Sequence, residues 1–408
     1  MNTKRPRCSV AAALSLVLAA VLMLAGCGSL TSPTDTSESQ VLTPEQREAV
    51  VIESKVGRYF DLVKDDRTSL SAFLNHMPKG GDVRLYTVWT VPPTQLQAAL
   101  PLTEADYRSI ITHAVTQRIG YLEVMVNVTP EHIAQLDAIQ QQVAKEYADK
   151  GLGFDVTVNY LACVDANFPI ARFKEELKAA VALYQSSERI VGITVIPATG
   201  AYSYDVFLEQ LAAIDEVYRA NGGTDGLPAG DSKAPRFSIP LDAATLSKLG
   251  YEGARESLAP ALKLGHPLRI DFCASAALEG DLYQLVTDMA KSEPGVTVSF
   301  TVVPAPGVAN PVASDVSAYR LFSSMGVPAT LVTDNGTGSY IELSDAYLTM
   351  ALAHRMSYTD LKALAYKSLD ASLLSIERQQ EERKKLDDAF KQFELGMSQT
   401  IDELKLLN

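Results

Sequence analysis

Residues 121–131, YLEVMVNVTPE, contain the unit that decides the fold. Residues 121–128 form an apolar run rich in Val and Leu, which is typical of a buried strand. Thr129, Pro130 and Glu131 follow directly. A capping residue, a proline at the first helical position and an acid in the first turn indicate the start of a helix. A strand that passes directly into a helix predicts a βα unit.

The same unit recurs along the chain. Seven further strand-like runs occupy residues 83–88, 154–163, 190–196, 237–241, 268–273, 296–303 and 329–333. The amphipathic stretches that follow the eight runs are residues 103–118, 129–150, 167–186, 203–220, 245–262, 281–291, 315–325 and 344–355. Eight strands, each followed by a helix, predict an α/β protein with a (β/α)8 TIM barrel.

Helical patterns flank the predicted barrel. Residues 44–76 predict one or two N-terminal helices, and residues 371–407 predict a long C-terminal helix. Residues 377–385 of that helix, ERQQEERKK, are a run of charges, which favours a solvated helix face. A face that binds a protein partner is the alternative.

The N-terminus has the layout of a secretory signal. Lys4, Arg5 and Arg7 precede an apolar run at residues 10–25, which is shorter than the ~20 residues that cross a bilayer. The run ends in Leu-Ala-Gly-Cys, which resembles a bacterial lipobox with Cys27 as the lipidated residue. This resemblance implies a lipoprotein anchored to the extracytoplasmic face of the cell membrane.

The sequence therefore predicts four segments. They are a lipoprotein signal peptide at 1–26, a flexible tether rich in Ser and Thr at 27–43, the barrel with its N-terminal helices at 44–374, and the C-terminal helix at 375–408.

Composition excludes several classes of protein. The chain has 408 residues, 36 Lys and Arg against 49 Asp and Glu, and a net charge of −13, so we expect no nucleic-acid partner. Four cysteines are too few for a disulfide scaffold. Cys163 and Cys273 lie in predicted strands, and buried thiols or a disulfide between them both remain open. A histidine-rich metal site would use most of the five histidines.

Two motifs resemble the adenosine deaminase family of metal-dependent hydrolases, especially its secreted, growth-factor-like branch. Residues 77–86, MPKGGDVRLY, are similar to its Met-Pro-Lys-Gly run before Leu-His-x-His. Residues 326–335, GVPATLVTDN, are similar to its Gly-Val-Pro-Val-Thr-Leu-x-Thr-Asp-Asp. The resemblance implies a barrel in which two His of strand one, a His of strand five and an Asp of strand eight hold Zn²⁺. It also implies hydrolytic deamination of a purine nucleoside.

The site positions that this resemblance implies are degenerate here. Asp334 alone among the implied zinc ligands is retained. The others are replaced as follows: Arg84 and Tyr86 for the strand-one histidines, Leu241 and Ala244 for the strand-five histidine and acid, Phe272 for the strand-six histidine, Pro197 for a glycine that donates a backbone N–H, and Asn335 for the second aspartate. Arginine stays protonated and cannot bind a cation, and proline has no N–H to donate.

The other histidines do not rebuild the site. His76 precedes the barrel and His266 lies in the loop before strand six, while three others fall in helical patterns: His113, His132 and His354. One hypothesis is that the Arg84 guanidinium takes the place of the metal and pairs with Asp334. The alternative is that these positions have drifted and share no role. We also expect Glu123, Asp242, Asp271 and Trp89 at the same mouth of the barrel.

These observations predict an inactive deaminase-like barrel, in which no cofactor is expected. Its role would be to bind a nucleoside-like small molecule in the old pocket, or a protein partner at the C-terminal helix. The alternative is a divergent metal-dependent hydrolase, an adenosine deaminase that needs zinc.

Overall fold

The computed structural model describes residues 42–86, 91–196, 204–223, 234–242, 268–273, 296–301, 329–333 and 342–407. The chain divides into two compact units, Met1–Arg47 and Glu48–Asn408, and the second holds every site discussed below. Several predictions fall outside the described residues: those at Cys27, Pro197, Ala244, His266, Asp334 and Asn335, and the helices at 245–262, 281–291 and 315–325. Trp89 and the side chains of Tyr86, Leu241, Asp242, Asp271 and Phe272 also lie outside the described part.

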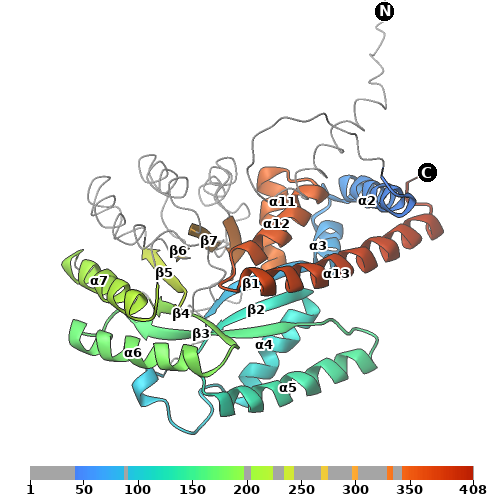
Figure 1. Ribbon diagram of the computed structural model, residues 1–408. Helices are drawn as coiled ribbons and strands as arrows, with labels where there is room; N and C mark the ends of the chain where they lie inside the picture. Colours follow the sequence, from blue (N-terminus) through green and yellow to red (C-terminus); the bar gives the residue numbers. More distant parts are fainter. Residues whose placement is uncertain are drawn as a thin grey trace, which may run out of the picture. The chain divides into compact units, whose positions relative to one another are not determined.

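The core of the second unit is a parallel sheet of eight strands, and each strand pairs with the next one along the chain (Figure 1). The strands are β1 (Lys79–Tyr86), β2 (Ile119–Met125), β3 (Thr157–Asp165), β4 (Ile190–Ile196), β5 (Phe237–Asp242), β6 (Leu268–Cys273), β7 (Val296–Thr301) and β8 (Ala329–Val332). All eight predicted strands are confirmed, and so is the α/β class with a parallel sheet.

The sheet curls, so that its first and last strands meet. The Asp82 carboxylate on β1 accepts hydrogen bonds from the backbone N–H of Thr333, just after β8, at 3.2 and 3.3 Å, and from the Thr333 hydroxyl. Both residues are buried. A buried carboxylate is stable only where donors face it, so this contact holds the two outer strands together. Closure of a complete (β/α)8 barrel remains a prediction.

Helices precede, follow and cover the strands. α2 (Pro44–Val63) and α3 (Arg67–His76) come first, as predicted. Those that follow β1 to β4 are α4 (Glu104–Thr116), α5 (Pro130–Asp149), α6 (Ile170–Ser186) and α7 (Tyr204–Ala220); α11 (Leu343–His354), α12 (Tyr358–Asp370) and α13 (Ile376–Glu403) follow β8. The Thr129 hydroxyl accepts from the His132 N–H, and His132 Nδ1 accepts from the Thr129 N–H. The predicted helix start is therefore confirmed. Within the described ranges, no helix is both long and apolar enough to cross a membrane.

The long C-terminal helix α13 packs on the rest of the second unit. Phe393 meets Phe73 of α3 edge to face, with ring centroids 5.5 Å apart. In the charged run at 377–385, Arg378 donates to Asn159 Oδ1 at 3.0 Å and Lys385 donates to the Thr157 hydroxyl at 2.9 Å. Most of the run is a solvated face, as predicted, since Glu377, Gln380, Glu381, Lys384 and Lys385 are exposed. One side of it, with Arg378, docks on the start of β3.

Lys79 fixes the beginning of β1. Its fully buried ammonium donates to three backbone carbonyls, those of Leu74 at 2.6 Å, Gln117 at 2.8 Å and Met77 at 3.1 Å. These bonds tie the turn before β1 to the turn before β2. Burial lowers the pKa of Lys79 to about 7, and the charge of Arg118 acts in the same direction.

The Lys79 pKa predicts how stability depends on pH. The unfolded chain binds this proton up to about pH 10.4, whereas the folded chain begins to lose it near pH 7. The unfolded state therefore binds more protons between these values, and stability rises with pH there. We expect the free energy of unfolding of the wild type minus that of Lys79→Met to rise from pH 7 to 10, by at most about 1.4 kcal/mol per pH unit. Urea unfolding measures this difference, and a flat or falling curve would contradict the assignment.

Candidate functional site

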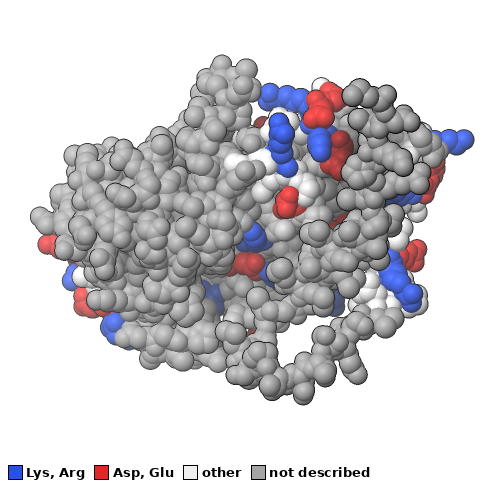
Figure 2. Space-filling view, turned by 90° about the horizontal axis from the view of Figure 1, so that it is seen from above, with Lys and Arg blue, Asp and Glu red and all other residues white. Residues whose placement is uncertain are grey.

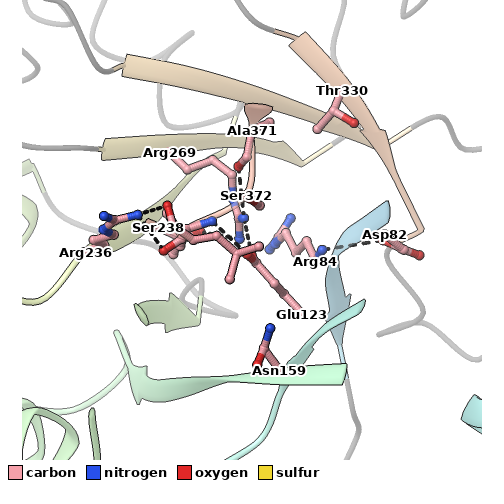
Figure 3. Close-up of polar contacts among 12 residues, drawn as sticks. Asp82, Arg84, Glu123, Asn159, Arg236, Ser238, Arg269, Thr330, Ala371 and Ser372 are labelled. Atoms are coloured by element: carbon pink, nitrogen blue, oxygen red, sulfur yellow. Dashed lines mark hydrogen bonds and ion pairs between the residues drawn. The ribbon is translucent and has the colours of Figure 1, made fainter. Parts of the chain in front are cut away.

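One ion pair spans the concave face of the sheet. Arg269 of β6 donates to Glu123 of β2 at 2.5 Å between Nη1 and Oε2, and neither side chain is exposed (Figure 3). The two strands are four apart in the sheet order. Residues on nonadjacent strands of a curled sheet meet only across its interior, so this pair marks the inner face.

Arg84 lies on β1 where the strand register shifts, between Asp82 and Leu85. Such a bulge redirects side chains and is frequent next to functional sites. Only 1% of Arg84 is exposed, and its side chain extends from β1 toward the interior (Figure 3). Cys163 of β3 is a buried free thiol. Burial raises the pKa of this thiol, and the charge of Arg84 acts against the rise.

The chemistry of the Arg84 side chain shows whether β1 can bind a metal ion. Arg84 stands where the resemblance places the first zinc-binding histidine. A guanidinium keeps its proton and offers no lone pair, and its charge repels a divalent cation. The residues described on β1 therefore do not fit zinc. The part of the chain that the structure describes also brings together no group of three His, Cys, Asp or Glu that could hold a metal ion. The proposed pairing of Arg84 with Asp334 lies outside the described residues.

Four histidines lie on helices, away from the inner face. The predictions for His113 in α4, His132 in α5 and His354 in α11 are confirmed, and His76 ends α3 before the sheet begins. His132 belongs to the helix cap described above, and its Nε2 lies 3.0 Å from the carbonyl oxygen of Ala98.

Glu123 does not lie at the mouth, where we expected it. Its Oε1 accepts the Leu373 N–H at 2.7 Å and the Tyr121 hydroxyl at 3.0 Å. Burial raises the pKa of Glu123, while the Arg269 charge and these donors oppose the rise. The expectation was wrong because Glu123 is committed to residues 371–374, the connection between α12 and α13. We call this connection the plug.

Two arginines complete the contacts of the plug. Arg236, just before β5, donates to the carbonyl oxygens of Leu373, at 2.9 Å, and Leu374. Arg269 donates to the carbonyl oxygen of Ala371 at 3.4 Å. Both arginines stand at the N-terminal ends of their strands. In barrels of this kind the N-terminal end serves stability and the C-terminal end carries function. The plug network therefore lies at the end that serves stability.

At the C-terminal end, a strap of residues 91–98 lies over β2 and β3. Asn127, just after β2, donates to the carbonyl oxygens of Val91 at 2.7 Å and Cys163 at 3.1 Å. The backbone N–H of Thr94 donates to Glu176 of α6 at 2.9 Å, and its hydroxyl also donates to this carboxylate. The strap is thus held by Asn127 at the end of β2 and by Glu176 of α6.

Asn127 and Glu176 are not among the residues predicted from the sequence. A signal was present in each case. Asn127 interrupts an apolar strand-like run, and Glu176 lies among the buried residues Phe173, Leu177 and Ala180 of α6. A polar residue at an apolar position predicts a specific partner, although not which one.

Comparisons with known proteins find the fold but no close relative. No family model matches the chain, and no curated protein matches it. Among solved structures, the apo N6-methyl-AMP deaminase from Arabidopsis thaliana is 13% identical with a TM-score of 0.51, covering 79% of this chain and 99% of that one. An ADAL–IMP complex is 14% identical with a TM-score of 0.50 and the same coverage. A zinc-bound amidohydrolase from Burkholderia ambifaria is 14% identical, with a TM-score of 0.49 and coverage of 79% and 93%.

These matches describe the fold of the chain. The chain has the α/β fold, with a curled parallel sheet, of deaminase-type amidohydrolases. At these identities the likeness concerns the fold and carries no activity to this chain.

The plug network predicts a large cost for removing Arg269. Arg269→Met leaves the Glu123 carboxylate buried without its cation, which typically costs about 3–5 kcal/mol of unfolding free energy. Glu123→Gln combined with Arg269→Met should recover part of this loss, because neither position of the pair then carries a buried charge. Urea unfolding of the single and double variants measures both values.

The control is an exposed ion pair. Lys145 and Asp149 lie 2.6 Å apart on α5, with 76% and 64% of their side chains exposed. Lys145→Met should cost less than about 1 kcal/mol. The assignment fails if Arg269→Met costs no more than Lys145→Met.

Proposed function

We propose that this chain is a lipid-anchored protein of the extracytoplasmic face of the cell membrane. Its adenosine-deaminase-like barrel binds a nucleoside-like molecule without deaminating it. The observation that carries the proposal is the buried guanidinium of Arg84 on β1, at the position of the family's first zinc ligand. In the adenosine deaminase family, which the chain resembles, zinc activates the attacking water. A fixed organic cation cannot replace zinc in that role.

A guanidinium suits recognition, however. Its five N–H donors form a rigid fork that matches carbonyl, carboxylate and phosphate oxygens. Arg84 lies two residues from Asp82, which bonds to Thr333, and Asp334 follows Thr333 in the chain. This neighbourhood supports the proposal that Arg84 and Asp334 pair and present one polar surface to a ligand.

The membrane anchor is proposed from the sequence. The Leu-Ala-Gly-Cys motif supports lipidation of Cys27, and the Ser- and Thr-rich residues before α2 suit a tether. A diacylated cysteine holds a protein at a membrane by its lipid chains, so no basic patch is required. On the face shown in Figure 2, basic side chains of the described residues lie beside acidic ones.

A second candidate function is a divergent metal-dependent hydrolase that deaminates a purine nucleoside. The observation that favours it is the fold likeness to the Arabidopsis N6-methyl-AMP deaminase, which extends over 79% of this chain. This candidate requires zinc ligands in residues that do not match the family motifs. A docking role for α13 toward a protein partner is compatible with either candidate.

Metal analysis separates the two candidates. We expect the purified wild-type chain, after incubation with zinc and desalting, to contain far less than one zinc per chain by inductively coupled plasma mass spectrometry. We also expect no conversion of adenosine to inosine by ultraviolet absorbance, with an active deaminase as positive control. Stoichiometric zinc together with turnover would establish the second candidate instead.

Ligand binding is tested by thermal unfolding with a panel of purine nucleosides and nucleotides. A ligand at 100 times its Kd stabilises the folded state by about 2.7 kcal/mol, which raises the Tm by several degrees. We expect Arg84→Met to lose this shift while still unfolding cooperatively, and Lys145→Met to keep it. If no member of the panel shifts the wild-type Tm, the nucleoside-like ligand is refuted.

A further inference from the structure

A groove lies between α13 and the N-terminal end of the sheet, away from the strap at the C-terminal end. Its volume is about 680 Å³. Its apolar walls are formed by Phe154 before β3 and by Leu386, Phe393 and Met397 of α13. We call it the α13 groove. Small-molecule sites typically occupy about 300–1,000 Å³ and are mostly apolar, so its size and lining suit a small molecule.

Glycines line the groove on both sides. Gly120 and Gly153 line the sheet side and Gly396 lines the helix side. A Cβ added to Gly396 would meet nothing within 4 Å. Glycine weakens the middle of a helix, and no close backbone approach requires it here. Glycine at this position therefore leaves empty space in the groove.

The charges around the groove favour a cation. Arg118 donates to the carbonyl oxygen of Gly153 at 3.0 Å and lies over the Phe154 ring, 5.4 Å from its centroid. Lys385 is paired with Glu382 at 2.9 Å. Asp155 and Asp388 also line the groove, are exposed, and have no ion-pair partner within the described residues. The carboxylates of Asp155 and Asp388 therefore outnumber the one guanidinium at the groove, that of Arg118, which already donates to a carbonyl oxygen.

We propose that the α13 groove binds an amphipathic organic cation. The apolar body of the molecule lies between Phe154, Leu386 and the Phe393–Met397 side of α13, which removes apolar surface from water. Its positive group faces the carboxylates of Asp155 and Asp388 at the rim. The proposal does not depend on a ligand in the barrel or on the absence of zinc.

The test compares two fluorescent probes of opposite charge on the full chain carrying Cys27→Ser, which prevents lipidation. Rhodamine 6G is the amphipathic cation, and 8-anilinonaphthalene-1-sulfonate is the amphipathic anion. We expect saturable binding of the cation by fluorescence anisotropy. Asp155→Asn combined with Asp388→Asn should weaken it at least tenfold, without a matching loss for the anion.

Gly396→Leu tests the groove itself, because the leucine side chain fills the space. We expect it to weaken the cation at least tenfold. Gly57→Leu is the matched control, since Gly57 lies inside the helix α2 and a Cβ there also meets nothing within 4 Å. Replacing a helical glycine favours the helix in both variants, so both should remain folded.

Three results would overturn the proposal. The first is that the cation shows no saturable binding to a chain that unfolds cooperatively. The second is that Gly396→Leu binds the cation as tightly as Gly57→Leu does. The third is that the anion binds as tightly as the cation and the two asparagine substitutions change neither.

Discussion

The ion pair between Glu123 and Arg269 is the constraint on which the interior depends. A carboxylate and a guanidinium buried at 0% exposure must satisfy each other and every remaining donor and acceptor. Glu123 does so with the Leu373 N–H, and Arg269 does so with the carbonyl oxygen of Ala371. The plug is therefore part of the core, and the position of α13, which begins two residues later, follows from the same contacts.

The plug distinguishes the two ends of the sheet. Residues 371–374 occupy its N-terminal end, whereas in (β/α)8 barrels function is carried at the C-terminal end. On that side the strap is held by Asn127 and Glu176, and Arg84 projects inward from the β1 bulge. A sheet with stabilising contacts at one end can keep its fold while residues at the opposite ends of its strands change.

The sequence predicted the strands and helices well because apolar runs and helix starts are local signals. The cap at Thr129 is one example, since all its atoms lie within four residues. The place of Glu123 could not be predicted, because its partners are 146 and 250 residues away. The docking of Arg378 on Asn159 was missed for the same reason: a run of charges has the same pattern whether it faces water or a strand.

The register of β5 and β6 bears on the candidate site. Arg269 donates to the Ser238 hydroxyl at 3.4 Å, so these two positions share the inner face. Their ladder runs without a shift to the pair Asp242 and Cys273. Faces alternate along a strand, so positions 240, 242, 271 and 273 belong with Ser238 and Arg269, and positions 241 and 272 belong to the other face. A motif alignment that is uncertain by one residue cannot make this distinction, whereas one interior contact can. The inner face beyond the plug then includes the buried Arg84 and, by strand register alone, positions 242 and 271.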